Sequence, residues 1–296
     1  MRNIETIGFI GLGVMGEPMC RNIAKKHNGD VVAFDINSST LLKLADTNVE
    51  LAESLENLIM KSDLILLSLP GGMEVEDVCL GPSGIINHLQ DGQFVIDCST
   101  APPNLSRKIY ERYNKIGVVF ADSPVARTRQ AALNGTLSIM VGAEPGIFSI
   151  IEPILSYMAT DIVHCGKVGA GQVCKILNNM VLFQNIAALS EAIAIGTQAG
   201  VEVEKLFESI SMSSGDSFAL RNHGMKSILL EEYPAGAFSV NYALKDLTYA
   251  LDLSKASGVV AEGAERINRL FKSAIEEGWG DNYHPIIKKV IENIKS

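Results

Sequence analysis

The chain has 296 residues, of which 47% are hydrophobic and 20% charged, and its formal net charge is −9 at pH 7. These values are typical of a globular protein and exclude disordered and fibrous classes. The acidic balance argues against binding to nucleic acid or to an anionic membrane, so a local basic residue would have to hold any anionic substrate.

The spacing of the cysteines and histidines bears on disulfides and metal sites. The five cysteines form no Cys-x-x-Cys pair, and the five histidines show no metal-ligand spacing. We therefore expect reduced thiols and no metal site.

No basic segment followed by an apolar one opens the sequence, and polar residues interrupt the longest apolar stretch, about 176–195. These features predict no signal peptide, no membrane span and a cytoplasmic location.

The first half of the sequence alternates short apolar runs with helical patterns. Strands are predicted at 4–10, 31–34, 64–69, 94–97, 118–120 and 137–141, and the first helix at 16–27. Continuous β-branched and leucine runs between helices are typical of a parallel sheet that is covered on both faces. Residues 1–165 are therefore predicted to form a doubly wound α/β domain of the Rossmann type.

The pattern changes after about residue 165. A glycine-rich connection at 166–171 leads into one long helical pattern that ends at residue 199, before Gly200. At about 1.5 Å per residue, this helix would be roughly 40 Å long. Further helices are predicted at about 202–212, 217–230, 241–256, 259–276 and 284–295. The sequence thus predicts an all-α second domain, 166–296, joined to the first by the long helix.

The long predicted helix is apolar on several faces. A helix of this kind is seldom left exposed on a single chain. We therefore expect a homodimer or homotetramer.

Three glycines in the pattern G-x-G-x-x-G stand between the first predicted strand and the first predicted helix. Gly11 would make the tight turn, Gly13 would let the backbone approach a pyrophosphate, and Gly16 would let helix and strand pack closely. The free N–H groups of the helix N-terminus favour phosphate. The residues predicted to contact a dinucleotide at this turn are Gly11, Leu12, Gly13, Val14, Met15 and Gly16.

An acidic residue follows the second predicted strand. Asp35 lies 24 residues after Gly11, close to the spacing of about 20 residues that is typical of the acid that binds the adenosine ribose. Its carboxylate would accept from the 2′-hydroxyl and repel a 2′-phosphate, and residues 36–39 include no arginine. This predicts NAD as cofactor, with NADP less favoured. The alternative is a plain glycine turn with Asp35 as a capping residue.

Two later strand ends are expected to border the cofactor, because ligands in such sheets bind outside the carboxyl ends of the strands. Leu69 and Pro70 end one predicted strand, while Ser99 and Thr100 follow another. Thr100 could hydrogen-bond the nicotinamide ribose or orient a substrate hydroxyl. Its alternative role is that of a helix N-cap.

Four residues of the long helix, Lys175, Asn178, Asn179 and Leu182, are spaced i, i+3, i+4 and i+7 and share one face. The polar groups among them would be costly to bury without partners. A lysine at a cleft can act as a general acid or base when its pKa falls towards about 7–8, which a positively charged nicotinamide ring would favour. The alternative is a solvent-exposed lysine.

An ordered set of motifs over nearly the whole chain resembles the β-hydroxyacid dehydrogenases, such as 3-hydroxyisobutyrate dehydrogenase. The motifs are GLGVMGEPM at 11–19, DCST at 97–100, DSPV at 122–125, GTLSIMVG at 135–142, GAG at 169–171 before Lys175 and Asn178-Asn179, and KDL at 245–247. The resemblance implies reversible NAD-dependent oxidation of a small anionic β-hydroxyacid to its semialdehyde or keto form.

The resemblance also implies roles for single residues. Lys175 matches the catalytic lysine, which exchanges the hydroxyl proton while hydride moves at nicotinamide C4. Asn179 matches the asparagine that holds substrate and lysine, and Thr100 and Lys245 match positions that contact the cofactor. Relatives that reduce imines replace the lysine, so its presence here speaks against that branch.

The sequence departs from most of these relatives at 126–128. They follow Asp-x-Pro-Val with Ser-Gly-Gly, whose backbone and hydroxyl hold a substrate carboxylate, whereas this chain has Ala-Arg-Thr. An arginine suits an oxyanion, and the stretch resembles the Gly-Arg-Thr of sulfolactaldehyde reductases. Leu182 stands where those enzymes have serine, which weakens a sulfonate assignment. The predicted substrate contacts are Ser99, Ala126, Arg127, Thr128 and Asn178; the alternative for Arg127 is a surface salt bridge.

Three other functions are considered. A sulfolactaldehyde-type reductase would use Arg127 to bind a sulfonate. Oxidative decarboxylation of a phosphorylated sugar acid, as in the more distant 6-phosphogluconate dehydrogenases, would require a longer chain with a larger helical region. A non-catalytic NAD-binding regulator is disfavoured by the pairing of Lys175 with Asn179.

Overall fold

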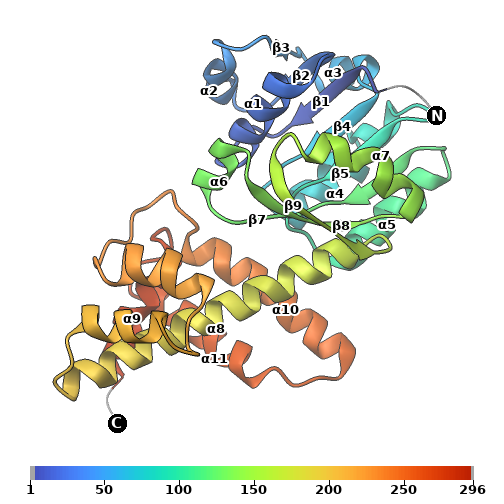
Figure 1. Cartoon of the computed structure of the whole chain (residues 1–296). Coiled ribbons are helices and arrows are strands. Elements are labelled where there is room, and N and C mark those ends of the chain that lie inside the picture. Colours follow the sequence, from blue (N-terminus) through green and yellow to red (C-terminus); the bar gives the residue numbers. More distant parts are fainter. Residues whose placement is uncertain (1–3, 295–296) are drawn as a thin grey trace. The chain divides into compact units, whose positions relative to one another are not determined.

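A computed structural model describes residues 4–294 and divides the chain into two compact units, Met1–Lys175 and Ile176–Ser296 (Figure 1). The division falls within helix α8 (Ala170–Gln198), ten residues beyond the boundary expected at 165/166. The expectation about a signal peptide rests partly on residues 1–3, which lie outside the described residues.

The first unit is built on one sheet, which has nine strands within the described residues. The strands are β1 (Thr6–Ile10), β2 (Asp30–Phe34), β3 (Glu50–Leu51), β4 (Leu64–Leu67), β5 (Phe94–Asp97), β6 (Val119–Asp122), β7 (Val125–Ala126), β8 (Leu137–Gly142) and β9 (Ala159–Gly166). Their order is β3-β2-β1-β4-β5-β6-β8-β7, and β9 also pairs with β8. The chain order of the first strands reverses between β1 and β4, which is the arrangement of a doubly wound fold.

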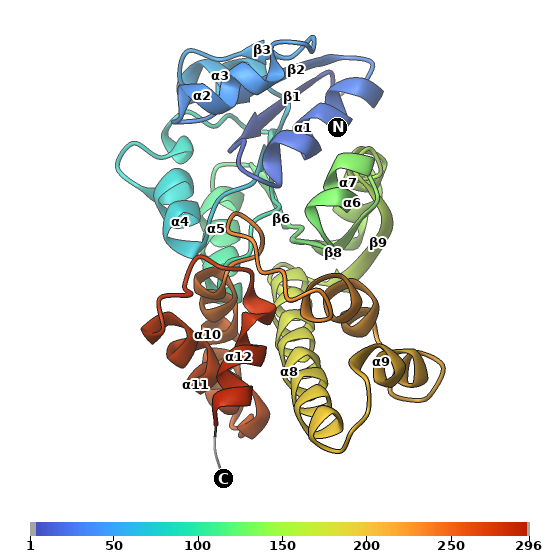
Figure 2. The ribbon, with the colours of Figure 1, turned by 90° about the vertical axis from the view of Figure 1, so that its left-hand side faces the viewer.

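Helices cover both faces of this sheet (Figure 2). They are α1 (Gly16–Lys26), α2 (Ser38–Leu41), α3 (Leu55–Lys61), α4 (Gly72–Leu80), α5 (Pro103–Asn114), α6 (Arg129–Asn134) and α7 (Pro145–Leu155), with short 3-10 turns η1 (Leu42–Leu44) and η2 (Ile85–Asn87). Phe9 of β1 belongs to one buried core with Met19 of α1. Ile65 of β4 belongs to the core on the other face, with Ile109 of α5. Burial on both faces explains why these strands are apolar throughout.

The expected parallel sheet holds from β1 to β6 and then changes. Strand β8 pairs antiparallel with both β6 and β7, and only its pairing with β9 is parallel. A parallel neighbour needs a crossover of about a dozen residues or more. Here the link between β7 and β8 holds only the six-residue helix α6, so the chain turns back beside its own strand. Strands β3, β7 and β9 were not predicted.

The second unit is helical within the described residues. From residue 176, it contains the rest of α8, then α9 (Val203–Ser211), η3 (Leu220–Ile228), α10 (Val240–Ser257), α11 (Glu262–Glu276), η4 (His284–Ile286) and α12 (Ile287–Asn293). Its core includes Phe183, Phe207 and Phe271. The helix predicted at 284–295 is a 3-10 turn followed by α12, and its residue 295 lies outside the described residues.

One predicted helix has a different hydrogen-bond pattern. Element η3 is a π-helix, and its C-terminal end shows the five-residue step, because the Leu229 N–H donates to the Gly224 carbonyl. Gly224 packs against Phe207, where a Cβ atom would lie 3.2 Å from the ring. π-Helical bonding is rare, and apolar periodicity alone does not distinguish it from α-helix.

Helix α8 has the length and composition of a membrane span. An 18-residue window has a mean hydropathy of 1.4, so on that measure the expectation of too polar a stretch is wrong. Core helices reach such values as well, and Phe183, Ile186 and Ile193 of α8 are buried in the core of the second unit. The apolar character of α8 is therefore accounted for in part by packing.

Candidate active site

The glycine turn between β1 and α1 shows why each glycine is required. Gly11 has a φ of +93°, and a Cβ there would lie 2.3 Å from the Ser68 carbonyl oxygen. A Cβ on Gly16 would lie 2.0 Å from the Gly11 carbonyl oxygen. Gly13 is different, because its Cβ would meet no described atom within 4 Å. Two glycines are thus dictated by packing inside the protein, and the middle one faces open space.

The turn fits the pyrophosphate of a dinucleotide. Gly13 and Val14 are exposed, and no side chain caps the N-terminus of α1 among the described residues. The Glu17 N–H donates to the Gly13 carbonyl at 3.2 Å, and Pro18 has no N–H. The exposed backbone of the turn itself, at the positive end of the α1 dipole, is therefore the part suited to an anion.

Asp35 is held at this turn by two backbone bonds. The Leu12 N–H donates to its Oδ2 at 2.6 Å, and the Asn37 N–H donates to its Oδ1 at 2.8 Å. These are the contacts of the capping alternative. A carboxylate offers about four acceptor sites, so Asp35 keeps capacity for a ribose hydroxyl beside the turn.

The loops after β4 and β5 are joined through Ser99. The Leu69 N–H donates to Ser99 Oγ at 2.9 Å, and Ser99 is buried. The Ser99 N–H in turn donates to Asp97 Oδ1 at 2.9 Å. The structure therefore shows Ser99, predicted to contact substrate, as a link between two loops predicted to border the cofactor. Thr100, half-buried, follows it.

The start of α8 is bonded to the ends of β5 and β6. Asp122 accepts the Gly169 N–H at Oδ1 (2.6 Å) and the Gln172 N–H at Oδ2 (2.8 Å). The Gln172 side chain donates from Nε2 to the Ser99 carbonyl at 2.8 Å and accepts the Ala101 N–H at Oε1, 3.0 Å away. Sequence reasoning missed both residues, although Asp122 opens the DSPV motif and Gln172 precedes Lys175 by three positions.

Two buried carboxyl groups lie side by side at these strand ends, because Asp97 of β5 and Asp122 of β6 are paired in register. Burial raises the pKa of Asp97 to about 7, against the lowering effect of its bonds with Ser99. Burial also raises the pKa of Asp122 to about 6, opposed by the N–H groups of Gly169 and Gln172. Both groups therefore titrate close to neutral pH, directly beside the start of α8.

In the second unit, residues of α8 and α10 form one polar chain. Asn178 Nδ2 donates to Asn179 Oδ1 at 3.1 Å, and Asn179 Nδ2 donates to Asp246 Oδ2 at 2.7 Å. Lys245 Nζ lies 3.3 Å from Asp246 Oδ1 and 4.7 Å from the centre of the Tyr242 ring. The structure thus brings together three predicted residues, Asn178, Asn179 and Lys245, with Asp246, whose only sequence signal was its place beside Lys245. Lys175 lies one turn before Asn179 on α8.

The segment 126–128 departs from expectation at Arg127. Its guanidinium donates to the Thr136 carbonyl at 2.7 Å and to Thr160 Oγ1 at 3.0 Å, and pairs with Asp161 Oδ2 at 2.7 Å. These contacts are those of the salt-bridge alternative. The proposed anion contact stays a prediction, and Asp161 already neutralises the charge of this guanidinium.

The backbone at Arg127 adopts a conformation that favours glycine. Its φ is +85°, a region that costs a residue with a side chain about 1–2 kcal/mol. On either side, Ala126 pairs with Ser138 in β8, and the Thr128 hydroxyl caps α6 by accepting the Ala131 N–H at 3.4 Å. Neither neighbour contacts the residues at the glycine turn in the described bonds.

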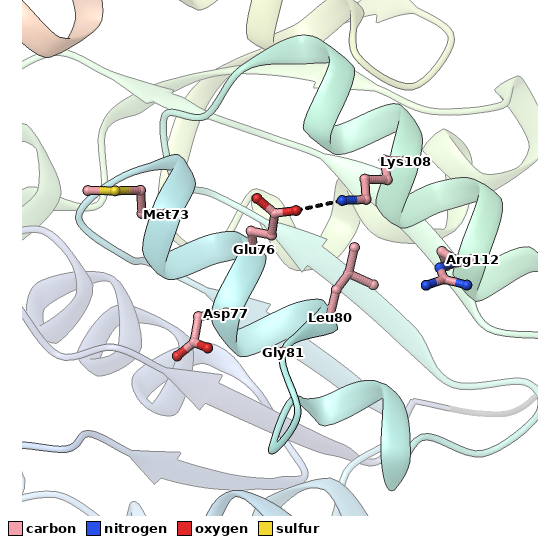
Figure 3. Close-up of a pocket in the computed structure, with 7 residues that line it drawn as sticks. All are labelled: Met73, Glu76, Asp77, Leu80, Gly81, Lys108 and Arg112. Carbon is pink, nitrogen blue, oxygen red and sulfur yellow. Dashed lines mark hydrogen bonds and ion pairs between the residues drawn. The ribbon is translucent and has the colours of Figure 1, made fainter.

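An open hollow of about 360 Å³ is lined by residues of α4 and α5 and by Gly81 (Figure 3). Its lining residues are Met73, Glu76, Asp77, Leu80, Gly81, Lys108 and Arg112. Glu76 pairs with Lys108 across it at 2.6 Å, and both side chains are exposed, so the pair contributes little. The hollow contains none of the predicted site residues, and it is not a candidate active site.

Family models match both units. One described as the NAD binding domain of 6-phosphogluconate dehydrogenase matches residues 6–166, and one described as NAD-binding of NADP-dependent 3-hydroxyisobutyrate dehydrogenase matches 169–291. The chain is also 34% identical over 288 residues to 2-(hydroxymethyl)glutarate dehydrogenase of Eubacterium barkeri, covering 97% of this chain and 95% of the relative. The chain belongs to the β-hydroxyacid dehydrogenase family. The resemblance seen in the sequence is thereby confirmed.

Other members of the family show how the substrate varies. The chain is 30% identical to NAD-dependent L-serine dehydrogenase of Pseudomonas aeruginosa, covering 98% of both chains. It is 32% identical to mitochondrial 3-hydroxyisobutyrate dehydrogenase of Mus musculus, covering 94% of this chain and 84% of the relative. A solved structure of Mycobacterium tuberculosis 3-hydroxyisobutyrate dehydrogenase with L-serine matches with a TM-score of 0.88 at 26% identity, covering 98% and 99% of the two chains. This β-hydroxyacid dehydrogenase is therefore an NAD(P)-dependent oxidoreductase acting on CH–OH groups. The predicted enzyme class and fold class are confirmed, and the preference for NAD over NADP stays a prediction.

Proposed function

We propose that this protein is an NAD-dependent dehydrogenase that interconverts a small β-hydroxyacid and its semialdehyde or keto form, with Lys175 as general acid/base. The observation that carries the proposal is the attachment of α8 to the strand ends. Asp122 and Gln172 tie the first turn of α8 to the segment around Thr100, and Lys175 follows Gln172 by three residues. A lysine is thus held on a helix bonded to the edge of the sheet where dinucleotides bind.

The residues of this chain divide the chemistry as follows. The N–H groups at Gly13 and the start of α1 would hold the pyrophosphate, and Asp35 the adenosine ribose. When bound, NAD supplies the acceptor for the hydride that leaves the carbinol carbon. Neutral Lys175 would accept the hydroxyl proton during oxidation, and its ammonium form would return a proton during reduction. Asn179, one turn along α8, would help to hold the substrate.

The substrate class follows from the chemistry that three relatives share. L-serine, 3-hydroxyisobutyrate and 2-(hydroxymethyl)glutarate are named in those enzymes, and each has a hydroxymethyl group on the carbon next to a carboxylate. We propose the same hydroxymethyl carboxylate core for this protein. The pairing of Arg127 with Asp161 disfavours the sulfolactaldehyde-type alternative, because the Asp161 carboxylate already neutralises the charge that would attract a sulfonate.

A substrate panel tests this proposal. Purified protein should oxidise at least one of the three hydroxymethyl acids with NAD. Arg127→Ala should change kcat/KM by less than about threefold, because an exposed guanidinium already paired with Asp161 contributes little to an incoming anion. The measurement is initial-rate NADH absorbance with each acid, and with sulfolactaldehyde and NADH for the sulfonate class.

The neighbouring exposed Arg129 provides the control, as Arg129→Ala. A loss of about 100-fold or more in kcat/KM for Arg127→Ala alone would show that Arg127 binds the anion. It would contradict the assignment of Arg127 to a surface salt bridge. Tight binding of NAD with no turnover of any panel member would instead favour a non-catalytic NAD-binding protein.

We also propose that the chain assembles as a homodimer or homotetramer. Within the second unit, α8 leaves Leu177, Val181 and Ile195 exposed, at 39%, 52% and 70% of their accessible surface. Apolar side chains repeated along one helix favour burial against a partner. Sedimentation velocity measures the assembly directly, and a monomer at micromolar concentration would contradict the proposal.

A further inference from the structure

The Gln172 side chain makes hydrogen bonds with the backbone on both sides of Thr100. Its Nε2 donates to the carbonyl of Ser99, and its Oε1 accepts the N–H of Ala101. Gln172 is fully buried, so water does not substitute for either bond. We infer that Gln172 is a positioning residue that fixes the segment around Thr100 relative to Lys175.

These two hydrogen bonds connect three parts of the first unit. The backbone N–H of Gln172 is held by Asp122 of β6, so the residue that clamps the β5 loop is itself anchored to the next strand. On its other side, Ser99 accepts the N–H of Leu69 through its hydroxyl, which extends the connection to the β4 loop. Two loops that border the predicted cofactor position are thus bonded to the helix that carries Lys175, the β5 loop directly by the Gln172 side chain and the β4 loop through Ser99.

Glutamine meets a requirement that few side chains can meet. The site needs one donor and one acceptor in a single planar group, facing a carbonyl and an N–H at the same time. A protonated glutamic acid offers the same pair, whereas an ionised one only accepts and would face the Ser99 carbonyl with no hydrogen to donate. The protonation state of a glutamate at this position would therefore determine whether both hydrogen bonds form.

This inference rests on the proposed role of Lys175, and it makes a separate prediction. In Gln172→Glu, burial would raise the pKa of the new carboxyl group, as would the negative charge of the nearby Asp122. Below that pKa, the neutral acid should keep both hydrogen bonds, and kcat should stay within about threefold of wild type. Above it, kcat should fall by at least about tenfold, because misplacing catalytic groups by 1 Å can cost about 100-fold. NAD affinity should fall by less than kcat, since the contact at Thr100 would weaken but the pyrophosphate turn is untouched.

The experiment compares kcat for the best hydroxymethyl acid of the panel from pH 6 to 9.5, each value divided by that of wild type at the same pH. Asp97 and Asp122, with Arg107 near Asp122, are charged groups of this region in both proteins, so the ratio removes the contribution that they make in wild type. The new carboxylate would also raise the pKa of Asp122, and the fall in kcat is therefore compared with Gln172→Met, which adds no charge. Gln198→Glu makes the same chemical change at the exposed end of α8 and should give a flat ratio. Gln172→Met, of similar size but without hydrogen bonds, should be impaired at every pH.

Melting temperature and NAD binding are measured for each variant across the same pH range. A flat ratio for Gln172→Glu, or a fall in kcat that follows unfolding, would overturn the inference. If Gln172→Glu does not fold, full activity in folded Gln172→Met would overturn it equally. Failure of the proposed function is a different result: Lys175→Ala would then keep normal turnover, or wild type would oxidise no panel member.

Discussion

Replacing Lys175 by alanine should lower kcat by about 10²- to 10⁴-fold, the usual contribution of general acid/base catalysis. NAD affinity should stay within about threefold of wild type, because Lys175 lies on α8 and the turn that would bind the pyrophosphate lies between β1 and α1. In the direction of oxidation, the wild-type rate should rise with pH as the lysine loses its proton, and the variant should lose this dependence. Initial-rate kinetics across pH, with calorimetric binding of NAD, measure both effects.

Lys205→Ala is the matched control, because Lys205 is an exposed lysine of α9 paired only at the surface with Glu208. It should leave kcat unchanged. A small primary amine added to Lys175→Ala should restore part of the rate, since it can occupy the space and exchange the proton. Near-normal turnover of Lys175→Ala without any amine would show that the assignment of Lys175 is wrong.

Changing Asp35 to asparagine should alter cofactor choice. The carboxylate lies at the glycine turn, held by the N–H groups of Leu12 and Asn37, and a hydrogen bond to a charged acceptor is worth about 1.5–3 kcal/mol. The KM for NAD should therefore rise about 10- to 100-fold, with kcat little changed. The kcat/KM ratio of NADP to NAD should rise as well, because the charge that repels a 2′-phosphate is removed.

Asp30→Asn provides the comparison, since Asp30 is exposed at the opposite end of the same strand, β2. It should leave the KM for either cofactor unchanged. Steady-state kinetics with NAD and NADP at fixed substrate give the values. A wild-type kcat/KM that is higher with NADP than with NAD would contradict the preference inferred from Asp35.

Several features of the fold could be predicted because their causes are local. Gly11 has a φ of +93° in the turn itself, and a Cβ on Gly16 would meet the carbonyl oxygen of Gly11, five positions earlier. Strand β5 was predicted at its observed bounds, because a run of apolar residues buried on both faces is visible in the sequence. Helix α8 was predicted to within a few residues, because Gly200, with a φ of +84°, follows its end.

Other features depended on partners that lie far apart in the sequence. Strand β8 runs antiparallel to β7 because the link through α6 is short, and apolar periodicity does not reveal the direction of a strand. Arg127 was predicted to bind an anion, with a surface salt bridge as the alternative; the structure shows a salt bridge with Asp161, 34 positions later, and the anion contact stays a prediction. Nothing in the sequence around Arg127 signals that partner.

The sequence by itself determined the glycine turn, the doubly wound first unit and the helical second unit. These follow from glycine positions and apolar periodicity, which act over a few residues. Only the tertiary structure decided where buried polar groups find their partners. Asp122 caps a helix that begins nearly 50 residues later, and Gln172 binds the backbone on both sides of Thr100 from 71 and 73 positions away. Burial forces each polar group to find a partner, and folding alone brings those partners within reach.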